Sequence, residues 1–439
     1  MSPREQAPMS PREQAPSAVE KATSARARPS AAIVLSGDEL LDGRTRDSNG
    51  RLLAGVLSGR GVRVASLAIV GDDRARLAAT LRCALAGEPD LLLVGGGLGT
   101  THDDLTAECL ADVLEVPLRE NDAALEMVSE RARDVAERRG LDFDELLERA
   151  RRQARLPAGA RPLPPAGVAP GIAAVAGVTR IFAFPGVPWE LRRMWAEVEA
   201  ELEREGFFPS VVTRLVRLYG AGELQISPVL EACARDLLWV GINIGPGEVT
   251  VILRHDTGEA ARAQAAAVVA ALEAELPVFS SDGRTVDDLL GEALRARAET
   301  VAVAESCTGG LLGARLTARA GSSDYVRGGV IAYADQVKQA LLGVPAELLE
   351  RHGAVSEEVA AAMAEGARHV AGATWGLGVT GVAGPSGGSP EKPVGLVYVG
   401  CAGPHGVHVA GNRFPGDRDN VRDWSVVRAL HLLREQLGV

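Results

Sequence analysis

Ser306 belongs to a segment whose residue types could support nucleophilic chemistry. Residues 301–304 are small or β-branched and apolar, which is typical of a buried strand, and apolar residues return at helical spacing from Leu311 onward. A strand, a tight turn and a helix start would place the Ser306 hydroxyl at the carboxyl edge of a sheet, beside outward-facing backbone N–H groups that can hold an anion or an oxyanion. Alternatively, Ser306 or Thr308 merely caps the helix. The motif alone leaves both interpretations open.

Lysine usage adds a candidate base. Only three of the 47 basic residues are lysine, namely Lys21, Lys338 and Lys392. Arginine cannot be deprotonated in a protein, whereas a desolvated lysine can accept a proton. Lys338 lies in residues 328–342, which read as a strand followed by a helix start. The alternative is a chance lysine on a solvated helix face.

Two later segments could hold a polar or anionic substrate. Residues 378–388, GVTGVAGPSGG, pass from an apolar strand into a glycine-rich turn around Thr380 and Gly384. Arg418 and Arg422 are four residues apart near the start of the final helix, so they share a face where the helix dipole also favours a phosphate. The alternatives are a loop that uses glycine for its turns, and two solvated surface arginines.

A glycine-rich loop near the N-terminus has a similar capacity. Residues 31–35, 62–69 and 90–94 read as strands that alternate with helices, which predicts a parallel sheet covered on both faces. The third strand leads into residues 95–104, GGGLGTTHDD, where a glycine loop lets backbone amides approach a phosphate. Asp103 and Asp104 could bind a divalent ion that bridges a pyrophosphate. One of them could equally cap the following helix.

Composition sets the broad class. The chain has 439 residues, 46% of them hydrophobic and 24% charged, which is ordinary for a globular protein of several domains. Its net charge of −11 argues against a general nucleic-acid binder. The five cysteines form no Cys-x-x-Cys pair, and no apolar run approaches the length of a membrane span. We therefore expect a cytoplasmic protein without direct nucleic-acid or membrane binding.

The chain divides into four parts. Residues 1–30 begin with the octet MSPREQAP, repeated unchanged at 9–16, and we expect them to be a disordered tail. We expect folded domains at 31–198, 199–282 and 283–439. The middle part reads as alternating strands and helices with ordinary core packing and no evident chemistry.

Four motifs carry a resemblance to a known family. AESCTGG (304–310), YADQVK (333–338), VTGVAGPSGG (379–388) and GDRDNVR (416–422) resemble the C-terminal domain of the competence/damage-inducible CinA family, which includes nicotinamide-nucleotide amidases. Residues 31–195 resemble that family's N-terminal domain, which is related to molybdopterin-binding proteins. The resemblance implies an α/β fold class: a three-layer α/β molybdopterin-binding-like domain, a small α+β connecting domain and an α/β amidase domain.

The resemblance implies hydrolysis of nicotinamide mononucleotide to nicotinic acid mononucleotide and ammonia, without a cofactor. Ser306 would attack the carboxamide and Lys338, kept neutral by partial burial, would take its proton. Tyr333 would orient or relay that proton. The amides of residues 308–310 would stabilise the oxyanion. The substrate-binding set implied in this way is Thr308, Gly309, Gly310, Thr380, Gly384, Arg418 and Arg422.

For the N-terminal domain, the resemblance implies a ligand loop and a metal-dependent ADP-ribose pyrophosphatase. The divalent metal would be bound by Asp103, Asp104 and Glu190. Thr100 and Asp38 depart from the family pattern, where proline and threonine are usual. The ligand loop implied in this way comprises Gly96, Gly97, Gly99, Asp103 and Asp104.

Two other functional classes remain open at the level of sequence. One is a molybdopterin-type ligand-binding module that uses the N-terminal glycine loop. The other is a non-catalytic protein associated with competence or DNA damage, which would tolerate Ser306→Ala and Lys338→Ala. The connecting domain leads us to expect a homodimer.

Overall fold

The computed structural model describes residues 28–233 and 237–439. The expected tail at 1–30 lies almost entirely outside these described residues. The described chain divides near residue 211 into two compact units, and each is presented by itself. Within the described residues, no helix is long and apolar enough to cross a membrane.

The first unit is built on one six-stranded sheet. Four neighbouring strands run parallel to one another. At one edge, β7 pairs antiparallel with the last of them, β8, and β6 pairs antiparallel with β7. Every residue of β3 is buried, as expected for a central strand with both faces covered. The strands, in spatial order, are β2 (Arg63–Val70), β1 (Ser30–Ser36), β3 (Leu91–Gly95), β8 (Thr179–Phe184), β7 (Gly171–Ala176) and β6 (Arg161–Leu163).

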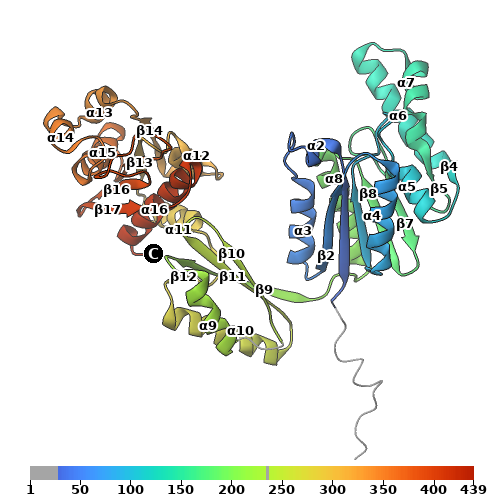
Figure 1. Cartoon of the computed structure of the whole chain (residues 1–439), viewed down its shortest axis with the longest axis horizontal. Helices are drawn as coiled ribbons and strands as arrows, with labels where there is room; N and C mark the ends of the chain where they lie inside the picture. The colour runs from blue at the N-terminus through green and yellow to red at the C-terminus, as the bar shows by residue number, and fades with distance from the viewer. Residues whose placement is uncertain (1–27, 234–236) are drawn as a thin grey trace, which may run out of the picture. The chain divides into compact units, whose positions relative to one another are not determined.

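Two hydrophobic cores lie on opposite faces of this sheet. Side chains alternate along a strand, so Ile33 and Leu35 pack into one core while Ala32 and Val34 pack into the other. The first core is completed by α3 (Asn49–Gly59) and α8 (Pro188–Arg204), and the second by α4 (Arg74–Ala86) and α5 (Thr106–Val113) (Figure 1). The expected three-layer α/β arrangement is confirmed. The remaining elements are α2 (Asp38–Leu41), β4 (Leu118–Glu120), α6 (Asp122–Arg139), α7 (Phe143–Ala150), the 3₁₀ segment η1 (Arg151–Ala154) and β5 (Arg155–Pro157).

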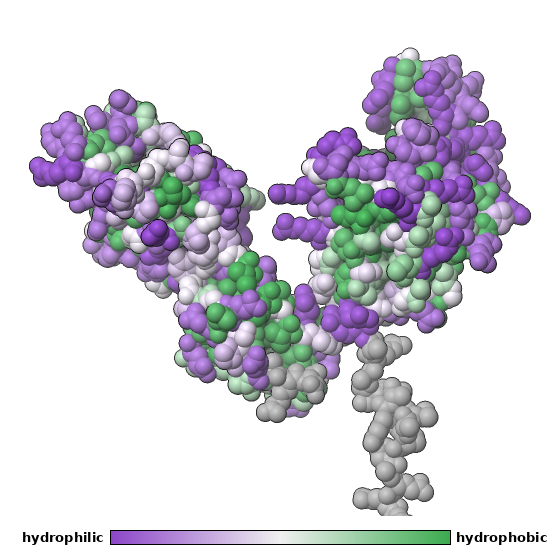
Figure 2. All heavy atoms as spheres, in the orientation of Figure 1, coloured by the Kyte–Doolittle hydropathy of each residue, from purple (hydrophilic) through white to green (hydrophobic). Residues whose placement is uncertain are grey.

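The second unit begins with a four-stranded sheet in the order β10-β11-β9-β12. Two helices, α9 (Glu223–Cys233) and α10 (Glu259–Glu275), pack on it and share its core (Figure 1). Hydrophobic residues gather over the β10–β11 part of this sheet in Figure 2, where Val240 and Ile244 are 38% and 59% exposed. The strands are β9 (Val211–Tyr219), β10 (Trp239–Ile244), β11 (Glu248–Asp256) and β12 (Val278–Ser280).

A five-stranded sheet follows, in the order β14-β13-β15-β16-β17. The first three strands are parallel and the last two antiparallel, so the carboxyl ends of β14, β13 and β15 meet at one edge. One face is covered by α11, α12 and α16, and the other by α13, α14 and α15. The strands are β13 (Val301–Glu305), β14 (Val326–Ile331), β15 (Trp375–Gly381), β16 (Leu396–Gly403) and β17 (Gly406–Arg413). The helices are α11 (Val286–Ala296), α12 (Leu311–Thr317), α13 (Asp335–Leu342), α14 (Ala346–His352), α15 (Glu357–Ala371) and α16 (Arg418–Leu437), with a 3₁₀ segment η2 (Ser322–Asp324).

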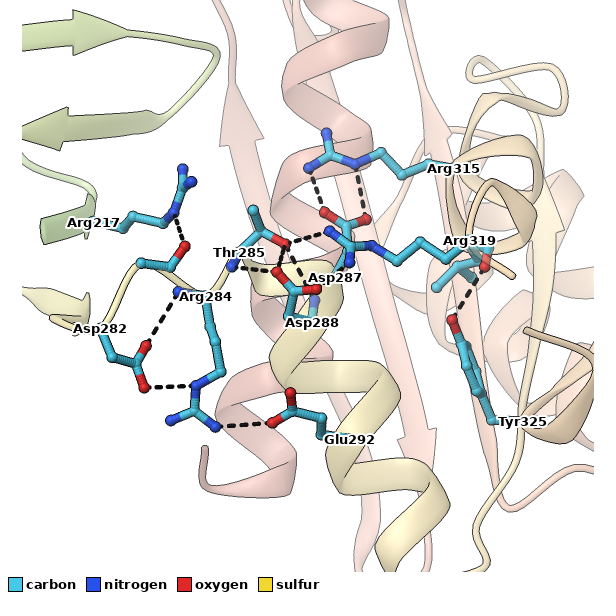
Figure 3. Close-up of polar contacts among 12 residues, drawn as sticks. Arg217, Asp282, Arg284, Thr285, Asp287, Asp288, Glu292, Arg315, Arg319 and Tyr325 are labelled. Atoms are coloured by element: carbon cyan, nitrogen blue, oxygen red, sulfur yellow. Dashed lines mark hydrogen bonds and ion pairs between the residues drawn. The ribbon is translucent and has the colours of Figure 1, made fainter. Parts of the chain in front are cut away.

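The start of α11 is fixed by a polar network shown in Figure 3. Thr285 and Asp288 form a capping box, in which each side chain accepts a hydrogen bond from the backbone N–H of the other residue. Arg319 donates to both of these side chains. Arg315 makes a two-pronged contact with Asp287, at 3.0 and 2.9 Å. These contacts attach the start of α11 to the segment that follows Ser306.

Candidate functional site

Ser306 leaves the end of β13 between the ends of its two parallel neighbours. Glu305 pairs with Ile331 of β14 on one side and with Val379 of β15 on the other. The Ser306 N–H then donates to the Val379 carbonyl at 2.9 Å. Ser306 is 9% exposed. Ser306 therefore lies at the carboxyl edge of a sheet, as the sequence predicts.

The turn after Ser306 differs in detail from the expectation. Neither Ser306 nor Thr308 caps α12, because Gly310 occupies the N-cap position without a side-chain cap. The Gly309 N–H donates to the Ser306 carbonyl at 3.2 Å, and the Gly310 N–H donates to Oε2 of Glu305 at 2.9 Å. Two of the three amides expected to stabilise an oxyanion thus already donate to other acceptors. The Thr308 amide remains the candidate for that role.

Lys338 is buried, at 1% exposed, so it is not a lysine on a solvated face. Its Nζ donates to Oδ1 of Asp335 at 3.0 Å and to the Tyr333 carbonyl at 3.2 Å. The expected proton acceptor therefore sits at the site edge as half of an ion pair. No hydrogen bond joins Lys338 to Ser306 among the described residues, so the pair must rearrange before a proton can pass between them.

The two arginines at the start of α16 reach the loops of three strands. Arg418 donates to the Gly384 carbonyl at 2.8 Å and to the Tyr333 hydroxyl at 3.3 Å. Arg422 donates to the Thr308 carbonyl at 3.0 Å. The segments that follow β13, β14 and β15 are thereby joined to one helix N-terminus. Arg418 is exposed and Arg422 is partly buried, so solvent reaches both side chains although each contacts a neighbouring loop.

Some buried polar groups near these loops make hydrogen bonds and others do not. The Thr380 hydroxyl donates to the Ala354 carbonyl at 2.7 Å, so it supports the fold of the loop. The Thr308 hydroxyl and the Nε of Arg422 are buried without a hydrogen-bond partner. Unpaired buried polar groups are uncommon and are often satisfied by a ligand or by water. Both belong to residues that already touch each other through the Thr308 carbonyl.

Cys307, next to the candidate nucleophile, is chemically quiet. Burial raises the pKa of its thiol to about 12. The thiolate is the reactive form of cysteine, so Cys307 stays protonated and unreactive near neutral pH. The adjacent hydroxyl is the better candidate.

Sequence reasoning missed two acidic residues at this edge, Glu305 and Asp335. Glu305 ends an otherwise apolar buried strand, and a carboxylate in such a position must have hydrogen-bond donors close by. Asp335 precedes Lys338 by three residues at a helix start, the spacing at which side chains on a helix meet. Both signals were present in the sequence.

The N-terminal glycine loop lines a pocket of about 640 Å³ in the first unit. Gly96 and Gly97 adopt φ values of +105° and +65°, which favour glycine. A Cβ on Gly96 would lie 2.4 Å from the Ser36 carbonyl oxygen. The loop backbone therefore borders the pocket directly. All five predicted loop residues line it, as does Glu190.

Asp103, Asp104 and Glu190 occupy different environments in that pocket. Asp104 closes the loop by accepting from the Thr101 N–H at 2.9 Å, and a side-chain hydrogen bond from Thr101 lowers the pKa of Asp103. Neither caps α5, whose N-cap is Leu105 without a side-chain bond. Burial raises the pKa of Glu190. Among the described residues, no three Asp, Glu, His or Cys side chains converge as a metal-binding group.

The pocket is strongly acidic. Six acidic side chains line it against the single basic residue Arg46. Burial, followed by the like charges of nearby carboxylates, raises the pKa of Asp72. Three buried polar atoms on lining residues lack partners: Ser36 Oγ, Asn49 Oδ1 and Gln153 Oε1. An anionic ligand would need a cation here, and these unpaired atoms offer it further polar contacts.

Comparison with known proteins agrees with the two-part resemblance. Residues 284–437 match the CinA C-terminal domain, and residues 32–204 match the family described as "Probable molybdopterin binding domain". A CinA-like protein of Anaeromyxobacter sp. (strain Fw109-5) is 42% identical over 411 residues, covering 92% of this chain and 98% of that protein. The chain belongs to the CinA family. A second CinA-like protein, from Koribacter versatilis (strain Ellin345), is 41% identical over 93% of this chain and 99% of its own length.

Solved structures of CinA proteins match one part of the chain. The competence/damage-inducible protein CihA from Agrobacterium tumefaciens is 38% identical, and the match covers 35% of this chain and 96% of that one with a TM-score of 0.34. The family resemblance drawn from the four motifs and from residues 31–195 is confirmed by the full-length relatives. This CinA protein thus carries a CinA C-terminal domain and an N-terminal domain of the probable molybdopterin-binding family.

Proposed function

We propose that the site at the carboxyl edge of β13 hydrolyses the carboxamide of nicotinamide mononucleotide to nicotinic acid mononucleotide and ammonia. One observation carries the proposal. Arg418 contacts the loop after β15 and Tyr333 after β14, while Arg422 contacts Thr308 after β13. A nucleophile, a buried amine and two guanidinium groups therefore belong to one connected edge, which is the set of groups that a phosphorylated amide requires.

The reaction proceeds through an ester on Ser306. Its Oγ attacks the carboxamide carbon while its proton passes to the unprotonated amine of Lys338. The tetrahedral intermediate collapses with cleavage of the C–N bond, and the departing nitrogen takes that proton and leaves as ammonia. Water then attacks the ester and releases the carboxylic acid. The Thr308 N–H is the donor of the turn that can support the oxyanion.

Lys338 must lose its proton to act. Its Nζ donates to Oδ1 of Asp335 at 3.0 Å and to the Tyr333 carbonyl at 3.2 Å, so these contacts must open first. Tyr333, whose hydroxyl accepts from Arg418, stands beside the lysine through its own carbonyl and can relay a proton between the amine and the substrate. Lys338 therefore becomes a base when the Asp335 contact opens.

The substrate phosphate is assigned to Arg418 and Arg422. Guanidinium groups bind phosphate with two parallel hydrogen bonds, and the N-terminus of α16 adds a favourable dipole. The unpaired Nε of Arg422 and the unpaired hydroxyl of Thr308 are donors that a bound substrate can satisfy. Gly309 lies close to Arg422, since a Cβ at this position would be 3.6 Å from Nη2 of the arginine. The glycine presents no side chain there.

The direct test is ammonia release from nicotinamide mononucleotide. Ser306→Ala and Lys338→Ala should each lower kcat by at least about a hundredfold, since each removes a nucleophile or its base. Ser323→Ala, at an exposed position in η2, is the matched control and should leave the rate unchanged. Full activity in Ser306→Ala, or none in the folded parent, would reject the proposal and favour a non-catalytic role.

The acidic pocket of the first unit supports a second candidate activity, cleavage of the pyrophosphate of ADP-ribose. Mg²⁺ commonly uses one or two carboxylates together with substrate phosphates, so a set of three convergent carboxylates is not needed. Asp103 and Asp104 would hold such an ion, with Glu190 nearby, and the ion would neutralise the pyrophosphate charge.

Titration of ADP-ribose by calorimetry, with Mg²⁺ and with EDTA, tests this second candidate. We expect binding with Mg²⁺ only, and weaker binding in Asp103→Asn. Asp324→Asn, which is exposed and belongs to the other unit, is the control. Binding of ADP-ribose that is equally strong with EDTA would reject the metal requirement, and no binding under either condition would reject this second candidate.

A further inference from the structure

Glu305 connects the strand that ends at the nucleophile with the helix that begins after it. It is the last residue of β13 and is 1% exposed. Its Oε2 accepts from the N–H groups of Gly310 at 2.9 Å and Leu312 at 3.1 Å, and its Oε1 accepts from Gly313 at 2.8 Å. No cationic side chain within the described ranges pairs with it. Its hydrogen-bond donors are backbone N–H groups at the start of α12.

The main chain of Glu305 is equally fixed. Its carbonyl accepts from the Ala332 N–H at 2.7 Å, and its backbone pairs with both neighbouring strands. Ser306 therefore lies between a residue held by its two neighbouring strands and a turn held by the side chain of that same residue. The turn cannot change shape without breaking either the strand pairing or the bonds to the carboxylate.

This arrangement also decides where a substrate anion cannot bind. The amides at the start of α12 would otherwise attract a negative group. Because the chain's own carboxylate occupies them, they are closed to the substrate phosphate. The phosphate is left to the arginines of α16, one of which donates to the Thr308 carbonyl of this turn.

We propose that Glu305 is a positioning residue for the amidase, a role that rests on the proposed function. It does not touch the substrate and acts through Ser306, by holding residues 306–310 in the one shape that presents the hydroxyl. Glu305→Gln keeps the size of the side chain but has a single acceptor oxygen. At least one of the three N–H groups then faces an amide NH₂, and the turn loosens.

The test compares Glu305→Gln with Glu299→Gln. Glu299 lies just before the same strand, where its carboxylate accepts from the Trp375 indole at 2.7 Å, so the matched variant makes the same change of charge away from the turn. For Glu305→Gln we expect kcat for ammonia release to fall by about ten- to a hundredfold, as small misplacements of a reacting group do. KM should change by less than about threefold, because the arginines bind the substrate. Glu299→Gln should retain kcat.

Labelling of Ser306 by a fluorophosphonate, followed by intact-protein mass, gives a readout that does not depend on turnover. We expect slower labelling of Glu305→Gln than of the parent. Absence of ammonia release from the parent would reject the amidase. Equal labelling of parent and variant, whether fast or absent, would reject the positioning role. Should Glu305→Gln fail to fold, Glu305→Asp keeps the charge but is too short for all three donors, and a parent-like kcat and labelling rate would again overturn the proposal.

Discussion

The Nζ of Lys338 lies 3.0 Å from Oδ1 of Asp335, three residues earlier on the same helix. The lysine side chain is 1% exposed while that of Asp335 is 50% exposed, so the ion pair runs from the interior to the surface. The carboxylate fixes the position of the amine, and it is also the part of the pair that solvent can reach. The proposed base is therefore restrained by a neighbour at the edge of the site.

Asp335→Asn should raise kcat for ammonia release by about two- to tenfold. The amide oxygen of asparagine holds the Lys338 amine less tightly than the carboxylate that now lies 3.0 Å from it, and the proposed base must leave this contact before it can act. Ammonia release from the variant and the parent tests this, with Asp324→Asn as the control. An unchanged kcat would mean that opening of the Lys338–Asp335 contact does not limit the rate.

His431 should make the second unit less stable in mild acid. Burial lowers the pKa of this side chain, which is stacked on Tyr219 with ring centres 3.7 Å apart and bonded to Glu248 at 2.8 Å. The unfolded chain keeps the ordinary value of 6.5 and binds the proton first, so stability present above that pH is lost as the pH falls through the lower folded-state pKa.

The measurement is the melting temperature of the parent and of His431→Gln at pH 7.5 and pH 5. At pH 7.5 the variant should be less stable by about 2 kcal/mol, because the stack and the hydrogen bond are lost. The difference should shrink at pH 5, where the parent loses its advantage. His405→Gln, at an exposed position, should follow the parent. A difference that is constant with pH would show that His431 does not titrate in this range.

Cys307→Ala should keep most of the activity. The thiol is protonated and buried, so its removal costs packing, about 1 kcal/mol, and no chemistry. Ammonia release and melting temperature measure the two effects separately. Exposed Cys83 should react with iodoacetamide in the native protein while Cys307 does not. Loss of activity in Cys307→Ala, together with an active Ser306→Ala, would transfer the nucleophile to the sulfur.

Gly96→Ala should abolish ligand binding in the first unit and spare ammonia release. The φ of +105° is unfavourable for alanine, and the new Cβ would meet the Ser36 carbonyl. Strain of this kind costs about 1–3 kcal/mol and displaces the loop. Gly55→Ala, where a Cβ meets nothing within 4 Å, is the matched control and should be neutral or slightly stabilising. Unchanged ADP-ribose binding by Gly96→Ala would remove the loop from the site.

The sequence predicts helices and strands better than it predicts contacts between side chains. The run of apolar residues that ends at Ser306 requires a buried strand, because such a run must be shielded from water. The alternation of strands and helices then requires a parallel sheet. The edge strand β10 escaped prediction. Leu237 and Leu238, just before it, are apolar like the strand itself, so the local pattern does not mark where β10 begins.

Contacts between residues far apart in the sequence could not be predicted from the local sequence pattern. Arg418 and Tyr333 are 85 residues apart, and only the order of the strands brings them together. The sequence motif suggested free amides after Ser306, whereas the Glu305 carboxylate accepts from the N–H groups of Gly310, Leu312 and Gly313. That outcome depends on whether a side chain bends back over the following turn, which packing decides and composition does not.

Helix α16 contacts two different parts of the second unit along its length. Arg422 contacts the nucleophile turn, and His431, nine residues later, is held between Tyr219 and Glu248 of the other sheet. At about 1.5 Å per residue, these points lie about 14 Å apart along one rigid rod. The family match begins at residue 284, yet that rod rests on residues well before it. A CinA C-terminal domain cut out at residue 284 would lack Tyr219 and Glu248, so His431 of α16 would lose both of these contacts.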